Sequence, residues 1–205
     1  MKNKFNWQTA IMAFALVEVM LFATGCGSTI SQIGNLLPAI GTLLSAVVAF
    51  ITGLSTSLPA TVQNDIKIIS EAADTGIVEA ESLLKSWTQS TSTTILGKVG
   101  DILNSVLGSL NSMLGDLGLT GSAAQKVQEL VGLAVTAIEG VLSLIPMFGN
   151  AAKASPHALG VMDKAGASQV KALHEHLKAS YAEIVGTPTG DAAVDAALAQ
   201  LPKSL

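Results

Sequence analysis

Apolar side chains recur at intervals of three and four residues through most of this chain, the spacing that gathers them on one face of an α-helix. No segment shows the strict alternation of apolar and polar residues that is typical of a half-buried strand. The pattern therefore predicts an all-α protein. The expected helices cover residues 30–54, 60–87, 95–117, 122–145 and 163–185, with a short final helix that Asp191 caps and that reaches Leu201.

Three of these segments carry a narrow apolar stripe and an otherwise polar surface. We expect the stripes to face a common core and the charged residues to face solvent. The stripe residues are Val62, Ile66, Ile69, Ala73, Ile77, Ala80 and Leu84 in the second helix, Val127, Leu130, Ala134, Ile138, Val141 and Ile145 in the fourth, and Val170, Leu173, Leu177, Tyr181 and Ile184 in the fifth.

The first expected helix is different because it has no charged residue, and none occurs between Gly27 and Asp65. Pro38 is expected at or near its start. Small residues then recur every four positions and would let another helix approach closely, a pattern that is common in membrane helices. These predicted helix–helix contacts are Gly41, Ser45, Ala49 and Gly53. Two interpretations stay open: a central helix buried by its neighbours, or a helix that contacts or enters lipid.

The third expected helix contains an internal repeat of seven residues, in which Ile102–Gly108 is followed by the similar Ser109–Gly115. A seven-residue period keeps one apolar seam in line, as in coiled-coil packing. The seam residues are Val99, Leu103, Val106, Leu110, Met113 and Leu117. Gly108 and Gly115 form a second line, which we expect at a close helix–helix contact within the chain or between copies of it.

The chain is expected to divide at a turn-rich stretch from Pro146 to Pro156. Residues 26–150 would form an apolar bundle of about four main helices. Residues 151–205, which are richer in alanine, lysine and histidine, would form a C-terminal tail with a pair of helices.

Residues 1–25 have the layout of a secretory signal: Lys2 and Lys4 precede an apolar run from Ala10 to Phe22, which small residues follow. That run is shorter than the roughly 20 residues of a membrane span. The segment from Phe22 to Cys26, the single cysteine of the chain, resembles the lipobox of bacterial lipoproteins. The resemblance implies that Cys26 is acylated on sulfur and becomes the new N-terminus.

Gly27 stands where an aspartate would favour retention in the inner membrane, so the resemblance points to the outer membrane in a cell with two membranes. The alternative is that Cys26 is an ordinary buried thiol behind an uncleaved anchor or an ordinary signal. The single cysteine supports lipid attachment, because an exported domain that disulfides stabilise needs cysteines in pairs.

Composition excludes one class of partner. Residues 26–205 contain nine lysines, fourteen acidic residues and no arginine. Nucleic-acid binding depends on many cationic contacts with phosphate, so we expect no nucleic-acid partner. Apolar residues make up 49% of the chain and charged residues only 13%, which fits a tightly packed bundle or a protein that meets lipid.

Residues suited to catalysis are scattered. His174 and His176 diverge by about 200° on a helix and cannot form the paired histidines of a helical zinc site. Asp191 and Asp195 share a face, but at a helix start, where carboxylates stabilise the helix dipole. No nucleophile elbow and no phosphate-binding loop occurs in the sequence. We therefore expect no enzyme, no cofactor and no metal.

These observations favour a lipid-anchored bundle of the cell envelope that acts as a structural or interaction module, with a protein partner or a second copy bound through helix packing. Two alternatives remain. The uncharged first helix could belong to a membrane-inserting or pore-forming protein, and a cavity between helices could carry an apolar ligand such as a lipid. Residues suited to line such a cavity are Phe50, Leu107, Met113 and Phe148.

Overall fold

The computed structural model describes residues 27–54, 60–86, 92–116, 120–149 and 156–205. Within these ranges the regular structure is entirely helical, which confirms the predicted all-α fold. The helices are α2 (Gly27–Gly53), α3 (Ala60–Lys85), α4 (Ser92–Asp116), α5 (Gly121–Gly149), α6 (Pro156–Gly186) and the short α7 (Ala192–Leu198).

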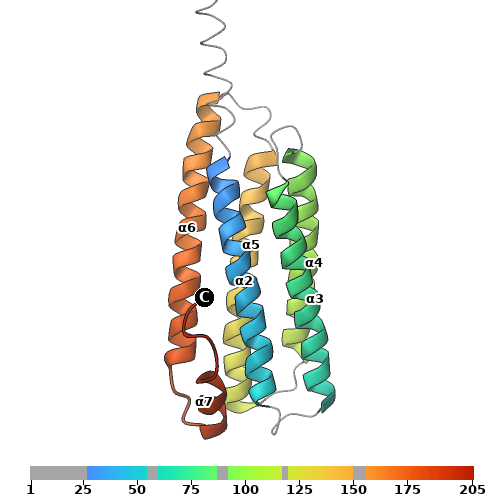
Figure 1. The fold of residues 1–205 in the computed structure, drawn as a ribbon, viewed down its shortest axis with the longest axis vertical. Helices are drawn as coiled ribbons and strands as arrows, with labels where there is room; N and C mark the ends of the chain where they lie inside the picture. Colours follow the sequence, from blue (N-terminus) through green and yellow to red (C-terminus); the bar gives the residue numbers. More distant parts are fainter. Residues whose placement is uncertain (1–26, 55–59, 87–91, 117–119, 150–155) are drawn as a thin grey trace, which may run out of the picture.

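The five long helices run side by side, and each is antiparallel to the next along the chain (Figure 1). Four of them, α2 to α5, pack in a closed ring in which each helix contacts the next and α5 contacts α2. α6 lies against both α2 and α5, and α7 contacts the end of α2. α2 therefore has four neighbouring helices and is the most central element of the fold.

The apolar face of α2 is buried inside the bundle. Leu36, Leu37, Ile40, Leu43, Leu44, Val47 and Phe50 have no exposed surface. This arrangement corresponds to the first of the two interpretations of the uncharged segment, a core helix that is covered by its neighbours. The burial of these side chains is the main apolar contribution of residues 27–54 to folding.

Pro38 lies inside α2 and not near its start, which corrects the expectation from sequence. A proline within a helix lacks the N–H that would bond to the carbonyl four residues earlier, and its ring crowds that carbonyl. The residue at that position is Gly34, where an added Cβ would have no heavy atom within 4 Å. The Pro38 carbonyl accepts a bond of 3.0 Å from the Thr42 hydroxyl one turn later.

The predicted stripes face the core wherever the structure describes their side chains. Ile66, Ala73, Ile77 and Ala80 of α3 are buried, as are the members of the heptad seam from Val99 to Leu110. In α5 the stripe from Val127 to Val141 is fully buried, while Ile145 is half-buried and packs against the core. Met113 and Leu117 lie outside the residues whose side chains are described.

The C-terminal helices belong to the same core as the rest of the bundle. Val170, Leu177 and Tyr181 of α6 are buried in one cluster with the apolar side chains of α2 and α5. The expected boundary near residue 150 is therefore not a boundary in packing. The helices flanking it are also longer than expected, because α5 continues past Pro146 to Gly149 and α6 begins at Pro156.

The last residues of the chain return to the bundle. The Tyr181 hydroxyl donates a hydrogen bond of 2.8 Å to the Pro202 carbonyl, and Leu201 is buried beside α7. Asp191 caps α7 as predicted, because its side chain accepts bonds from the backbone N–H groups of Ala193 and Val194. That helix ends at Leu198, one turn earlier than expected.

Candidate functional site

Cys26, the predicted lipid-attachment residue, lies outside the described residues. Its neighbour Gly27 is the first residue of α2. At the same end of the molecule α3 and α5 finish and α4 and α6 begin, as the paths of the helices in Figure 1 show. We call this the anchor end; α7 and the end of α2 lie at the opposite end. Any group carried by Cys26 is thus joined to the central helix without a spacer.

The first turn of α2 is fastened to α6 by two buried hydrogen bonds. The Thr29 backbone N–H donates to the Asp163 carboxylate at 3.0 Å. The Thr29 hydroxyl donates to the Asp163 carbonyl at 2.7 Å. The first N–H groups of a helix have no partner within the helix, and a carboxylate near them is stabilised by the helix dipole. Asp163 therefore serves as an N-terminal cap supplied by another helix, and the residue that it caps, Thr29, follows Cys26 by three residues.

A surface hollow of about 400 Å³ opens between α2 and α3 at the anchor end. The Glu81 carboxylate and the Lys85 ammonium on its α3 side are 2.6 Å apart and form an ion pair. The hollow therefore combines apolar residues with uncharged polar side chains and one ion pair whose charges largely neutralise each other. Its lining residues are Ile30, Ser31, Gly34, Asn35 and Pro38 of α2, and Glu81, Leu84 and Lys85 of α3.

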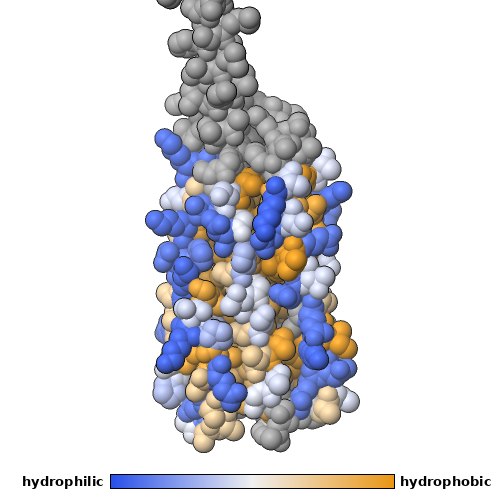
Figure 2. Space-filling view, viewed as in Figure 1, coloured by the Kyte–Doolittle hydropathy of each residue, from blue (hydrophilic) through white to orange (hydrophobic). Residues whose placement is uncertain are grey.

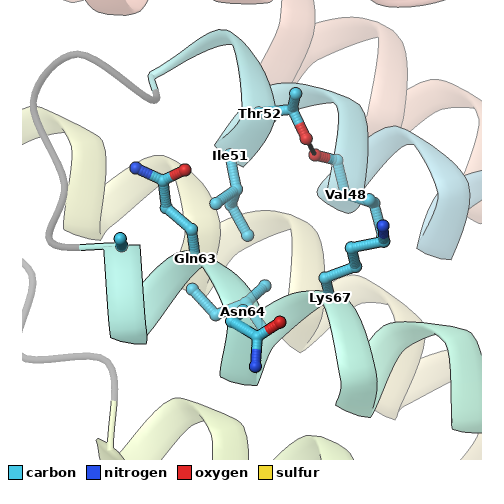
Figure 3. Close-up of a pocket in the computed structure, with 8 residues that line it drawn as sticks. Val48, Ile51, Thr52, Gln63, Asn64 and Lys67 are labelled. Atoms are coloured by element: carbon cyan, nitrogen blue, oxygen red, sulfur yellow. Dashed lines mark hydrogen bonds between the residues drawn. The ribbon is translucent and has the colours of Figure 1, made fainter.

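A second hollow, of about 340 Å³, opens between the same two helices at the opposite end (Figure 3). Lys67 reaches from α3 towards Val48 of α2 in this view. The Thr52 hydroxyl already donates to the Val48 carbonyl at 2.8 Å. Lys67 is 3.8 Å from Glu71, and both side chains are largely exposed, so this pair stabilises the fold little. The lining residues are Val48, Ile51, Thr52, Ala60, Gln63, Asn64, Ile66 and Lys67.

The four small residues predicted at a helix–helix contact in α2 do not share one. A Cβ added at Gly41 would lie 3.1 Å from the Asp74 carboxylate of α3, and one added at Gly53 would lie 3.1 Å from Ala197 of α7. Ser45 and Ala49 are exposed. Four residues turn a helix by about 400°, so the line drifts about 40° at each step and about 120° from Gly41 to Gly53.

The contact predicted at Gly108 is not present within the chain: the residue is exposed, and an added Cβ would have no heavy atom within 4 Å. Gly115 falls in α4, but its surroundings lie outside the described residues. Among the glycines whose surroundings are described, the tightest contacts lie instead at two that were not predicted from the sequence. A Cβ at Gly76 of α3 would lie 2.6 Å from Val106 of α4, and one at Gly140 of α5 would lie 2.5 Å from Leu173 of α6.

The titratable groups in the described part of the chain do not form a cluster suited to catalysis. Among the described residues no group of three or more His, Cys, Asp or Glu side chains could hold a metal ion. Burial, and secondarily the nearby Lys178, lowers the pKa of His174. Hydrogen bonds from the backbone and side chain of Thr189 lower the pKa of Asp195. The Asp195 carboxylate therefore has a structural role: it joins the loop after α6 to α7.

Lys126, like Asp163, is a buried charged residue with a structural role. Its ammonium donates to the Glu129 carboxylate at 3.0 Å and to the Ile184 carbonyl at 3.1 Å. Ile184 lies in the last turn of α6, where backbone carbonyls lack helical partners and a cation is stabilised by the dipole. A lysine of α5 therefore caps the end of α6.

Among the residues that the structure describes, two helices are long and apolar enough to cross a membrane by length and composition, Thr29–Gly53 and Gly121–Pro146. In the most apolar 18-residue window of each helix, 56% and 44% of the window, respectively, is buried within the bundle, and core helices of a bundle can have the same length and composition. Comparisons of the chain with protein-family models, with curated proteins and with solved structures find no match.

Proposed function

We propose that this protein is a lipid-anchored helical bundle of the bacterial cell envelope that acts as a structural or interaction module, attached to the membrane through Cys26. In a cell with two membranes we place it at the outer membrane, because Gly27 follows the cysteine. We propose no enzymatic reaction and no cofactor for it. Its partner is a protein or a second copy, not a nucleic acid.

One observation carries this proposal: the uncharged segment that directly follows Cys26 is the core helix of the bundle. The apolar face of α2 is in contact with α3, α5, α6 and α7. A helix whose apolar face is covered in this way leaves little apolar surface for lipid. Membrane attachment then needs another apolar group, and the acyl group implied by the lipobox resemblance supplies it at the first residue before α2.

The mass of the protein from membranes tests the attachment. We expect full-length protein expressed in a bacterium to lose residues 1–25 and to gain the mass of a lipid at Cys26. The Cys26→Ser variant is the matched control and should lack the added mass. Intact mass spectrometry reads both. A membrane-derived protein with the mass of the unmodified chain would refute the proposal.

Membrane insertion is a second candidate, because two helices have the length and composition of membrane spans. Release of a dye from phosphatidylcholine–phosphatidylglycerol vesicles separates the two functions. We expect the Cys26→Ser protein to release no dye between pH 5 and 8, since opening the bundle would expose the face of α2 that its neighbours bury. Release at low protein concentration would favour insertion over the structural module.

A carrier of an apolar ligand is a third candidate, and the geometry supports it less. Phe50, one of the residues expected to line a cavity, is completely buried in the packed core. Leu107 is half-buried and also packs against the core. Met113 and Phe148 lie outside the residues whose side chains are described. The two hollows between α2 and α3 are open to solvent and have none of these residues in their linings.

A further inference from the structure

We infer that the hollow between α2 and α3 at the anchor end is a binding site for an acyl chain, and that its occupant is the chain carried by Cys26. This inference rests on the proposed function, because it requires a lipid on that cysteine. It adds a defined place on the protein surface for part of the anchor.

The position of the hollow is the first argument. Gly27 is the first residue of α2, and the lining of the hollow begins at Ile30, about 4.5 Å further along the helix axis. The lining then follows one face of α2 to Pro38, a length of about 12 Å. An acyl chain attached one residue before α2 thus starts close to the hollow. A hollow of that length would hold part of a long acyl chain.

The rigidity of the attachment point is the second argument. The Thr29 backbone and hydroxyl both bond to Asp163 of α6, in a buried position. These bonds fix the first turn of α2 relative to the bundle, and Thr29 follows Cys26 by only three residues in the sequence. A tether that is held close to its site gives a high effective concentration of the attached group.

The chemistry of the lining is the third argument. Pro38 supplies exposed apolar surface, and the small accessible parts of the buried Ile30 and Leu84 lie at the base of the hollow beside the uncharged Ser31 and Asn35. The absence of a side chain at Gly34 leaves space between them. The charges of Glu81 and Lys85 are paired with each other at 2.6 Å. A lining with apolar surface and no unpaired charge is suited to an uncharged hydrocarbon chain and not to an anionic headgroup. The volume of about 400 Å³ falls within the usual range of ligand sites.

Photo-crosslinking tests the inference on the full-length protein. Cells are supplied with palmitate that carries a diazirine group, the protein is purified from membranes, and intact mass establishes that the probe is on Cys26. After the detergent is removed, irradiation should link the probe to peptides that contain residues 30–38 and 81–85. The yield should not depend on protein concentration, because the chain and the hollow belong to the same molecule.

Two glycine variants make the test specific. Gly34→Trp fills the hollow from a position with free space around its Cβ, so the fold should tolerate it. We expect this variant to reduce the crosslinks to these peptides about tenfold. That factor corresponds to the free energy lost when about two methylene groups of the acyl chain are no longer buried in the hollow. Gly97→Trp is the matched control: Gly97 is also a helical glycine near the anchor end with free space at its Cβ, but it lies on α4.

The outcomes separate the inference from the function on which it rests. A protein with the probe on Cys26 but with crosslinks absent from the two peptides, or unchanged in Gly34→Trp, would overturn the inference and leave the lipid anchor in place. Crosslinks whose yield rises with protein concentration would assign the hollow to the chain of a second molecule and also overturn it. A protein without lipid on Cys26 would refute both.

Discussion

The buried polar residues that the structure describes share one role, which is to join helix ends to neighbouring helices. Among the residues whose burial is described, Thr29, Lys126 and Asp163 are the buried polar and charged side chains. Asp163 caps the start of α2, and Lys126 caps the end of α6. Burial of a charge costs free energy unless it is paired or bonded, and the unpaired backbone groups of a helix end provide those bonds.

The capping role of Asp163 leads to the first prediction. We expect Asp163→Ala to lower the free energy of unfolding by about 2 kcal/mol, because the Thr29 N–H is then buried without its acceptor. Asp163→Asn keeps an oxygen in place and should lose less than half of that. Urea denaturation monitored by circular dichroism measures both. Equal losses in the two variants would mean that packing, and not the hydrogen bond, makes Asp163 important.

Tyr181 leads to a prediction about stability at high pH. Burial raises the pKa of its hydroxyl above the ordinary value of 10.0. The unfolded chain therefore ionises first, and the stability that this difference contributes is complete below pH 10 and declines as the pH rises towards the pKa of the folded protein. Tyr181→Phe should remove this loss of stability above pH 10.

The same substitution has a cost at neutral pH. Without the hydroxyl, the bond of 2.8 Å to the Pro202 carbonyl is lost, and we expect the free energy of unfolding to fall by about 1 kcal/mol. Thermal denaturation at a series of pH values from 7 to 11 measures both effects. Parallel curves for the two proteins above pH 10 would contradict the role assigned to Tyr181.

At the scale of elements, glycine positions decide which helix pairs can approach closely. Gly76 allows Val106 of α4 to approach α3, and Gly140 allows Leu173 of α6 to approach α5. Gly108 has no such neighbour and lies exposed on α4. Glycine within a helix lowers its stability by about 1 kcal/mol relative to alanine unless a close contact offsets this. The three glycines should therefore respond differently to the same substitution.

We expect Gly108→Ala to raise the free energy of unfolding by about 1 kcal/mol, because the new methyl group has free space. Gly76→Ala should lower it by about 1–3 kcal/mol, because the methyl group would meet the stiff, branched side chain of Val106 at 2.6 Å. Gly140→Ala should fall between them, since the atom it meets is the mobile end of Leu173. Urea denaturation of the three variants checks this order, and a stable Gly76→Ala would contradict the close packing of α3 and α4.

The sequence was sufficient to predict the faces of the helices, because periodicity is local and each stripe needs only a common core to face. The stripe of α3 from Ile66 to Ala80 illustrates this. The sequence was insufficient to predict which glycines make contacts, since that depends on which helix lies opposite each glycine. Asp163 could not be identified as a cap either, because it is 134 residues from Thr29 along the chain. The hollow beside α2 likewise depends on the packing of two helices.

At the scale of the molecule, the position of α2 bears on the proposed attachment of the protein to a membrane. The helix directly follows Cys26 and is also the element with the most helical neighbours. The described helices thus share one core that includes α6 and α7, while scattered hydrophobic side chains remain on the face seen in Figure 2. A domain that completes its core in this way can stand on the membrane surface and be held there by a lipid, without inserting any of its helices.

Hydrogen exchange tests this view of the whole molecule. In the Cys26→Ser protein in buffer without detergent, we expect the amides of α2 between Leu36 and Phe50 to be among the slowest to exchange, because they open only when the bundle unfolds. Amides in the exposed outer surface of α4 should exchange faster, through local opening. The control is the same measurement with anionic vesicles added, which should leave the protection of α2 unchanged. If α2 exchanges rapidly in buffer, or if vesicles alter its protection while the protein stays folded, then α2 leaves the bundle readily, and membrane insertion becomes the better account of its uncharged sequence.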